Sequence, residues 1–379
     1  MKTGRTLVDL ATELERQVNT RKDFVAPTTK LDAVVDETSG DILLKGLLER
    51  PLRMTDLAHG QVAAELGIYK PYYDRMRTEA PALCATNVNH WLHAQPKKRL
   101  VRTLDGAVRS FNSDGYRPLD NYDLLEALIP AVRDLGDVRV DSCEITEKRL
   151  YIKLVRPSLQ WDAAMAKREA LLAAGKDLHN RADWDALQKA DVVQAATTIR
   201  NSEVGCGALA IESGLYKLTC LNLATMEVAL RKAHVGRKHQ NGNGNGDDVY
   251  HLLSDEARQA DDKALWLRVR DVAKHTLSTA MFETNAKKWA GAAADRIGGD
   301  KVEQAAEVAA VKFGFSDATK AGVLKHLIES GDLSRLGLVN AVTRQSQDEK
   351  DYDAATDMER AGGALLAMAS GEFRSLLAK

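Results

Sequence analysis

The chain has 379 residues, of which 44% are hydrophobic and 28% are charged, and its formal net charge is −1. This composition is typical of a globular protein, and it excludes a global field that would draw the chain to nucleic acid or membrane, so any such attraction needs local patches. No apolar run approaches the roughly 18 residues that span a bilayer. Neither a signal peptide nor a C-x-x-C pair is visible, so we expect a cytoplasmic protein with reduced thiols and no membrane partner.

The first elements are a helix and short extended segments. Apolar residues at helical spacing predict a helix over Arg5–Asn19. Pro27 and the neighbouring threonines indicate a loop or extended stretch over Phe24–Lys30, and the apolar run Ile42–Leu48 predicts a short strand.

Residues Thr55–Met76 have the pattern of two helices joined by a tight turn. Thr55 is a plausible N-cap, Gly67 a helix stop, and Pro71 suits the first turn of a second helix. The pattern resembles a DNA-binding helix-turn-helix. Two packed core helices with a short connection explain it equally simply, and we favour that interpretation because such pairs are common.

A hairpin flanked by helices follows. We expect a helix over Asn87–Ala94, then two strands over Lys97–Arg109 joined by a turn at Asp105-Gly106. Asn121–Leu135 reads as a helix that begins at the cap residue Asn121 and ends at Gly136.

The middle of the chain contains further strands. Val138–Ile145 and Arg149–Val155 predict a hairpin with alternating burial. Trp161–Ala190 is rich in Ala and Leu and predicts a helix. Asp191–Val204 and Ala208–Cys220 return to strand-like composition.

A polar Asn-Gly tract then separates the strands from a helical end. Strands that neighbour one another as hairpins, without alternating helices, predict an α+β fold and not a doubly wound parallel sheet. We therefore expect a hairpin-rich antiparallel body with basic loops over residues 1–240, a flexible linker or loop over 241–250, and a mostly helical part over 251–379. Glycines are expected to interrupt these last helices at Gly298-Gly299, Gly314, Gly331 and Gly362-Gly363.

Two polar, turn-rich loops, Arg109–Asn121 and Asn201–Gly207, suggest a surface built for recognition. Cations surround the first of them, and rings are interleaved among the cations. Such a mixture is what binding of single-stranded nucleic acid requires, because cations pair with phosphates while rings stack on bases. A solvated hairpin whose rings fill the core explains the pattern about as well. The candidate residues are Lys97, Lys98, Arg99, Arg102, Arg109, Phe111, Tyr116 and Arg117, with Trp91 beside them.

A second basic cluster precedes the Asn-Gly tract. Arg231, Arg237 and Lys238 are its candidate phosphate-binding residues, with His234 among them. A mobile basic loop could close over a phosphate backbone; the end of a helix, where cations are favoured, is the alternative.

Catalytic and metal-binding patterns are weak, and we expect no cofactor. His90 and His93 have helical spacing but no acidic residue close in sequence completes a metal site. Glu203 and Glu212 could form a carboxylate pair around a glycine turn, and Cys206 lies in that turn. No nucleophile elbow, P-loop or dinucleotide fingerprint is present.

Six runs of the sequence form a recognisable set: Asn87–Leu92, Arg109–Asn121, Asn201–Leu209, Gly214–Cys220, Asn340–Arg344 and Tyr352–Gly363. Together they resemble the phage/plasmid-like proteins grouped as domain of unknown function 932. The resemblance covers most of the chain and departs at Leu221-Asn222-Leu223, where the family usually continues with Thr-Asn-Gly.

The resemblance implies a role in the DNA metabolism of a mobile element, in the cytosol of a host cell, and it carries no catalytic residue. Together with the basic clusters, the resemblance favours a phage DNA-binding protein that binds or anneals single strands during replication or recombination. We expect such a protein to form a homo-oligomer and to act as a binding protein rather than as an enzyme. The alternative is an interaction protein, such as an inhibitor of host defence or an assembly subunit. The DNA hypothesis requires that the cations gather into one exposed strip.

Overall fold

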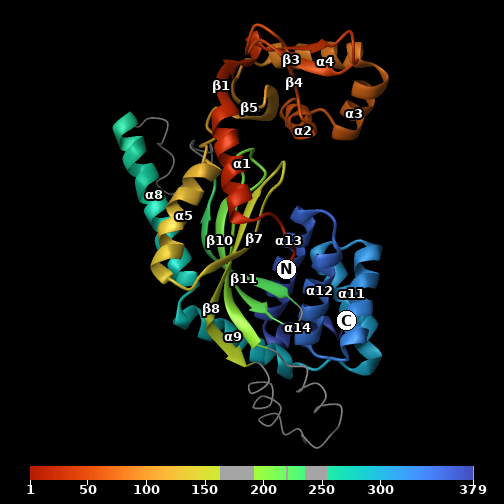
Figure 1. Ribbon diagram of the computed structural model, residues 1–379. Helices are drawn as coiled ribbons and strands as arrows, with labels where there is room; N and C mark the ends of the chain where they lie inside the picture. Colours follow the sequence, from red (N-terminus) through yellow and green to blue (C-terminus); the bar gives the residue numbers. More distant parts are fainter. Residues whose placement is uncertain (163–191, 219–220, 235–253, 379) are drawn as a thin grey trace, which may run out of the picture.

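The computed structural model describes residues 1–162, 192–218, 221–234 and 254–378. Its fold is α+β, as the hairpin pattern predicts. An N-terminal lobe of small sheets and short helices stands at one end of a larger body, in which helices pack on both sides of a long antiparallel sheet (Figure 1). The body begins with helix α1 (Leu7–Thr20), whose cap Thr6 accepts a hydrogen bond from the Asp9 N–H.

The N-terminal lobe contains two three-stranded antiparallel sheets, ordered β1-β5-β6 and β2-β3-β4. Helices α2, α3 and α4 pack around them, and their shared core runs from Ala26 to Phe111 along the chain. The elements are β1 (Lys22–Pro27), β2 (Asp32–Val35), β3 (Ile42–Lys45), β4 (Leu52–Arg53), α2 (Asp56–Glu65), α3 (Lys70–Glu79), α4 (Pro81–Ala94), β5 (Lys98–Leu104) and β6 (Ala107–Ser113).

Local signals account for the turns of this lobe. Asp105 and Gly106 adopt φ angles of 52° and 77°, the left-handed pair that a tight hairpin turn needs. Thr55 caps α2 by accepting from the Ala58 N–H, and Gly67 follows the helix with a φ of 66°. The predicted helix pair and hairpin are therefore confirmed.

The body is built on a five-stranded antiparallel sheet ordered β11-β10-β9-β8-β7. Ile152, Ile199 and Ile211 lie opposite one another in its register and share the face that enters the main hydrophobic core. The elements are α5 (Asn121–Leu135), β7 (Arg139–Ile145), β8 (Leu150–Asp162), β9 (Val192–Asn201), β10 (Leu209–Lys217) and β11 (Asn222–Lys232).

Helices cover both faces of this sheet (Figure 1). Helices α5, α8 and α9 lie on the face that carries Ile152, whereas α13 packs against β11 on the other face. The C-terminal helices are α8 (Asp255–Thr276), α9 (Thr279–Ala294), α10 (Val302–Phe313), α11 (Asp317–Ser330), α12 (Arg335–Asp348), α13 (Tyr352–Ala367) and α14 (Ser370–Leu376).

The hydrophobic cores divide the chain differently from the expected ranges. Leu265 and Val269 of α8 join Leu124 and Ile152 in one core, so the helices after residue 254 complete the body and do not form a core of their own. The separate core is that of the N-terminal lobe. Sequence ranges could not reveal this, because long-range packing decides which helices share a core.

Other expectations need correction. Gly362 and Gly363 lie inside α13 and do not interrupt it; a Cβ at Gly363 would lie 1.8 Å from the Thr225 carbonyl oxygen, so the glycine permits close approach of helix and sheet. Arg231 lies on strand β11, neither in a mobile loop nor at a helix end. Asn121 is the first residue of α5 and Asp120 its N-cap position. The predicted helix over Trp161–Ala190 and the linker over 241–250 lie mostly or wholly outside the described residues.

Candidate nucleic-acid interface

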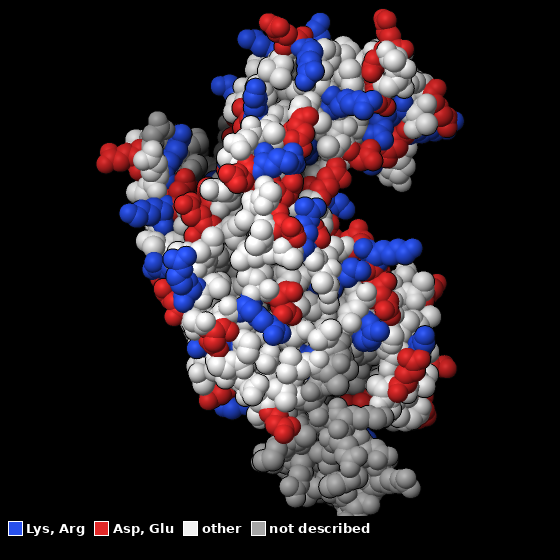
Figure 2. Space-filling view, viewed as in Figure 1, with Lys and Arg blue, Asp and Glu red and all other residues white. Residues whose placement is uncertain are grey.

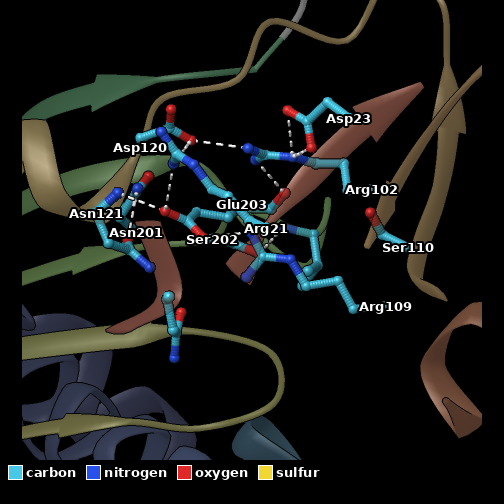
Figure 3. A network of polar contacts seen from close by, with 12 residues as sticks. Arg21, Asp23, Arg102, Arg109, Ser110, Asp120, Asn121, Asn201, Ser202 and Glu203 are labelled. Atoms are coloured by element: carbon cyan, nitrogen blue, oxygen red, sulfur yellow. Dashed lines mark hydrogen bonds and ion pairs between the residues drawn. The ribbon is translucent and has the colours of Figure 1, made fainter. Parts of the chain in front are cut away.

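A buried polar network joins the N-terminal lobe to the body, and Arg102 lies at its centre (Figure 3). The Arg102 side chain is 0% exposed. Its Nε donates to Asp23 at 3.0 Å, one terminal nitrogen donates to Asp120 at 2.8 Å, and the other donates to the Glu203 carbonyl at 2.9 Å. Two carboxylates and a carbonyl therefore satisfy a guanidinium that burial would otherwise penalise heavily.

Glu203 anchors the body side of this network. Its carboxylate pairs with Arg109 of β6 at 2.6 Å and accepts the Asn121 N–H at 2.6 Å. Gln61 of α2 donates to the Val204 carbonyl at 2.6 Å. The loop after β9 thus binds the strands and helix of the N-terminal lobe, which explains its charged and polar composition without any ligand.

Two further arginines of the first cluster are also engaged. Arg117 is buried and pairs with Asp261 and Asp262 of α8, at 2.8 and 2.5 Å. Arg99 is buried, pairs with Glu65 and lies 6.0 Å from the centre of the Phe111 ring.

The predicted stacking rings are not available either. Phe111 is 4% exposed and belongs to the core of the N-terminal lobe. Tyr116 stacks on His234 with the ring centres 5.1 Å apart and donates its hydroxyl to the Ser202 carbonyl at 2.8 Å. Burial lowers the pKa of His234 to about 4, so this ring is neutral at physiological pH.

The structure thus corrects the expectation of one exposed basic strip, and with it the DNA hypothesis in the form that depends on that strip. Arg99, Arg102 and Arg109 on β5 and β6, and Arg117 in the loop after β6, are buried and act as internal partners of carboxylates. On the face shown in Figure 2, Lys and Arg alternate with Asp and Glu and form no continuous basic band. Arg231 is exposed on β11, and Arg237 and Lys238 lie outside the described residues.

An accessible combination of ring and cations remains beside the first cluster. Trp91 of α4 is 45% exposed and borders a hollow of about 340 Å³. Lys97 borders the same hollow with Gln95 and Thr28, and Lys98 follows as an exposed residue at the start of β5. His90 packs edge-on against the indole at 4.9 Å between ring centres.

The hollow is locally electropositive. Glu65 accepts from Lys97 at 2.9 Å and also pairs with Arg99, so one carboxylate serves two cations. Lys98, the residue after Lys97 in the chain, is a further exposed cation. The arrangement offers an aromatic face, ammonium groups and neutral hydrogen-bonding groups, and it contains no pair of groups suited to acid–base chemistry.

The candidate catalytic groups are held apart by partners of their own. Glu203 pairs with Arg109, whereas Glu212 pairs with Arg200 at 3.2 Å and with Arg360 at 3.0 Å. Burial raises the pKa of the Cys206 thiol, which opposes formation of a reactive thiolate.

Metal-binding geometry is equally weak. Among the described residues, no three His, Cys, Asp or Glu side chains are grouped as a metal ion would require. His93 directs Nε2 to the Leu31 carbonyl at 3.0 Å, so its ring serves the packing of α4.

The sequence did not predict one fully buried ion pair of the body. Lys153 on β8 and Glu359 on α13 approach to 2.7 Å with both side chains 0% exposed. Burial lowers the pKa of Lys153, which its neighbour Glu359 opposes. Alternation along β8 could have shown that Lys153 faces away from the Ile152 side, but no sequence signal identifies a partner on a helix some 200 residues later in the chain.

Within the described ranges, none of the helices has the length and apolar character needed to cross a membrane. Comparison of the chain with protein-family models, curated proteins and solved structures found no match.

Proposed function

We propose that this protein binds single-stranded nucleic acid, most simply single-stranded DNA, across the N-terminal lobe at the hollow beside Trp91. One observation carries the proposal: a half-exposed indole borders a hollow together with Lys97, next to a local excess of cations. Stacking of a base on an aromatic face tolerates any sequence, and ammonium groups hold the adjacent phosphates.

The charges favour a single strand over reading of a duplex by the helix-turn-helix. The three cations of α3 are all paired: Lys70 with Asp74 at 2.5 Å and Arg75 with Glu79 at 2.9 Å within the helix, and Arg77 with Asp56 of α2 at 2.8 Å. A recognition helix needs uncommitted cations and polar groups facing the bases and backbone. The hollow beside Trp91 offers an aromatic platform, which a stacked duplex does not require.

The resemblance to phage and plasmid proteins supports DNA as the ligand. The activity that we propose for this protein is binding or annealing of single DNA strands. Fluorescence anisotropy with a labelled oligonucleotide at low salt tests the proposal. Wild-type protein is expected to bind, and Trp91→Ala is expected to weaken binding about tenfold, because base–aromatic stacking contributes about 1–3 kcal/mol. Lys98→Ala should weaken binding and reduce its dependence on salt.

Matched variants separate this site from general effects. Tyr122→Ala removes a ring of similar exposure, 42%, from α5 in the body, and Lys325→Ala removes an exposed cation from α11. Both should bind like wild type. Absence of binding at micromolar protein, or equal losses in the control variants, would refute the proposal and favour a protein-interaction role.

A further inference from the structure

A second pocket of the N-terminal lobe lies between its small sheet and its helices. It has a volume of about 450 Å³ and brings together residues from the turn before β3, from β4, and from all three helices of the lobe. Arg53 comes from β4, His59 from α2 and Arg77 from α3. Three successive elements thus contribute to one pocket.

The two arginines have donor capacity to spare. One terminal nitrogen of Arg77 pairs with Asp56 at 2.8 Å, and one terminal nitrogen of Arg53 pairs with Asp41 at 3.2 Å. A guanidinium carries five N–H donors in a planar fork, so a single-nitrogen contact leaves most of them for another acceptor. Asp41 and Asp56 border the pocket as well, but their carboxylates are largely exposed to solvent, which weakens their repulsion of a bound anion.

His59 supplies a directed polar group in the pocket. His59 is only 4% exposed, and its Nδ1 atom lies 2.8 Å from the buried hydroxyl of Tyr73. Burial lowers the pKa of His59 to about 4, so the ring is neutral at physiological pH. When the Tyr73 hydroxyl donates to Nδ1, the proton resides on Nε2, which has no partner among the described residues and can donate to a ligand.

The donors of this pocket favour an anion with several oxygens. Among common ligands, the oxygens of a phosphate group match two planar guanidinium forks and a neutral imidazole donor.

We propose that this pocket binds the phosphate group of a phosphate ester, either the terminal phosphate of a nucleic acid or that of a small molecule. Arg53 and Arg77 contact the phosphate oxygens from opposite elements, and His59 donates from the floor of the pocket. The proposal does not depend on binding of nucleic acid beside Trp91, because none of the residues of that hollow borders this pocket.

Isothermal titration calorimetry with inorganic phosphate, against sodium chloride of equal ionic strength, tests the site. Wild-type protein should bind phosphate, and Arg77→Gln and Arg53→Gln should each weaken binding at least about tenfold. Arg75→Gln is the matched control, since Arg75 lies on α3 and is paired with Glu79, outside the pocket. Circular dichroism establishes that each variant remains folded.

Two further ligands show whether the bound phosphate belongs to the end of a nucleic acid or to a small molecule. A 5′-phosphorylated oligonucleotide that binds more tightly than its 5′-hydroxyl form, in an Arg77-dependent manner, identifies a nucleic-acid terminus. Glycerol phosphate binding without that difference identifies a small ester. Lack of phosphate binding by wild-type protein, or equal binding by wild type and both pocket variants, overturns the proposal.

Discussion

At the scale of single residues, burial decides which charged side chains can meet a ligand. Arg102 and Lys98 lie on the same strand, yet one is buried among carboxylates and the other is exposed. The sequence shows both as cations in a basic hairpin and cannot distinguish them, because their acidic partners come from distant segments. Glu203 lies about a hundred positions away, and only the folded chain brings it to the hairpin.

Removal of Arg102 should therefore affect stability, independently of any ligand. Arg102→Ala leaves Asp23 and Asp120 without their shared partner in a buried network, so we expect a loss of about 3 kcal/mol of unfolding free energy. Urea denaturation of the variant and wild type measures it. Lys98→Ala is the control and should unfold like wild type; an unchanged midpoint for Arg102→Ala would contradict the described network.

Burial of His59 makes the free energy of unfolding depend on pH, and the sign of that dependence follows from the direction of its pKa shift. Its pKa is about 4 in the folded protein and near 6.5 when unfolded, so the unfolded chain binds more protons between these values. The contribution of His59 is therefore present above pH 6.5 and is lost as pH falls toward 4. Other groups titrate in the same window, including Asp123, whose pKa burial raises to about 6 and which acts in the opposite direction.

A difference measurement isolates the histidine. The unfolding free energy of wild type minus that of His59→Gln should decrease from pH 7 to pH 4.5 in phosphate-free buffer. The slope of this difference against pH should correspond to the uptake of up to about one proton on unfolding. A difference that does not change with pH would show that His59 is not held neutral by burial.

At the scale of elements, local signals predicted what local interactions determine. The turn at Asp105-Gly106 and the cap at Thr55 appear in the structure. The alternating burial expected of β8 does not, because helices cover both faces of the sheet and bury residues 150–155 alike. The expected helix interruption at Gly362-Gly363 is wrong because glycine occurs both at helix ends and where a helix closely approaches another element. Only the element that packs against the glycine distinguishes the two cases. Here a β-strand lies opposite, and α13 packs directly upon it.

This contact predicts opposite effects for two helical glycines. Gly363→Ala places a methyl group against the Thr225 carbonyl, so overpacking should cost about 1–3 kcal/mol and outweigh the gain of about 1 kcal/mol in helix propensity. Gly291→Ala in α9 meets no atom within 4 Å and should be neutral or stabilising. Thermal unfolding compares the two, and a stabilising Gly363→Ala would contradict the packing of α13 on β11.

At the scale of the whole molecule, the α+β class followed from the succession of hairpins and helices, whereas the grouping of helices into cores did not. The helical end of the chain completes the core of the central sheet, and the N-terminal lobe has its own core. The two loops of distinctive composition lie where lobe and body meet, and most of their charges pair there (Figure 3). The accessible residues Trp91, Lys97 and Lys98 lie on the lobe alone.

Photo-crosslinking of a bromodeoxyuridine-substituted single strand, followed by peptide mapping, tests the location of binding most directly. The account predicts adducts in the segment from Trp91 to Lys98, and their loss in Trp91→Ala but not in Tyr122→Ala. Adducts confined to the body, or an adduct pattern unchanged by Trp91→Ala, would contradict it.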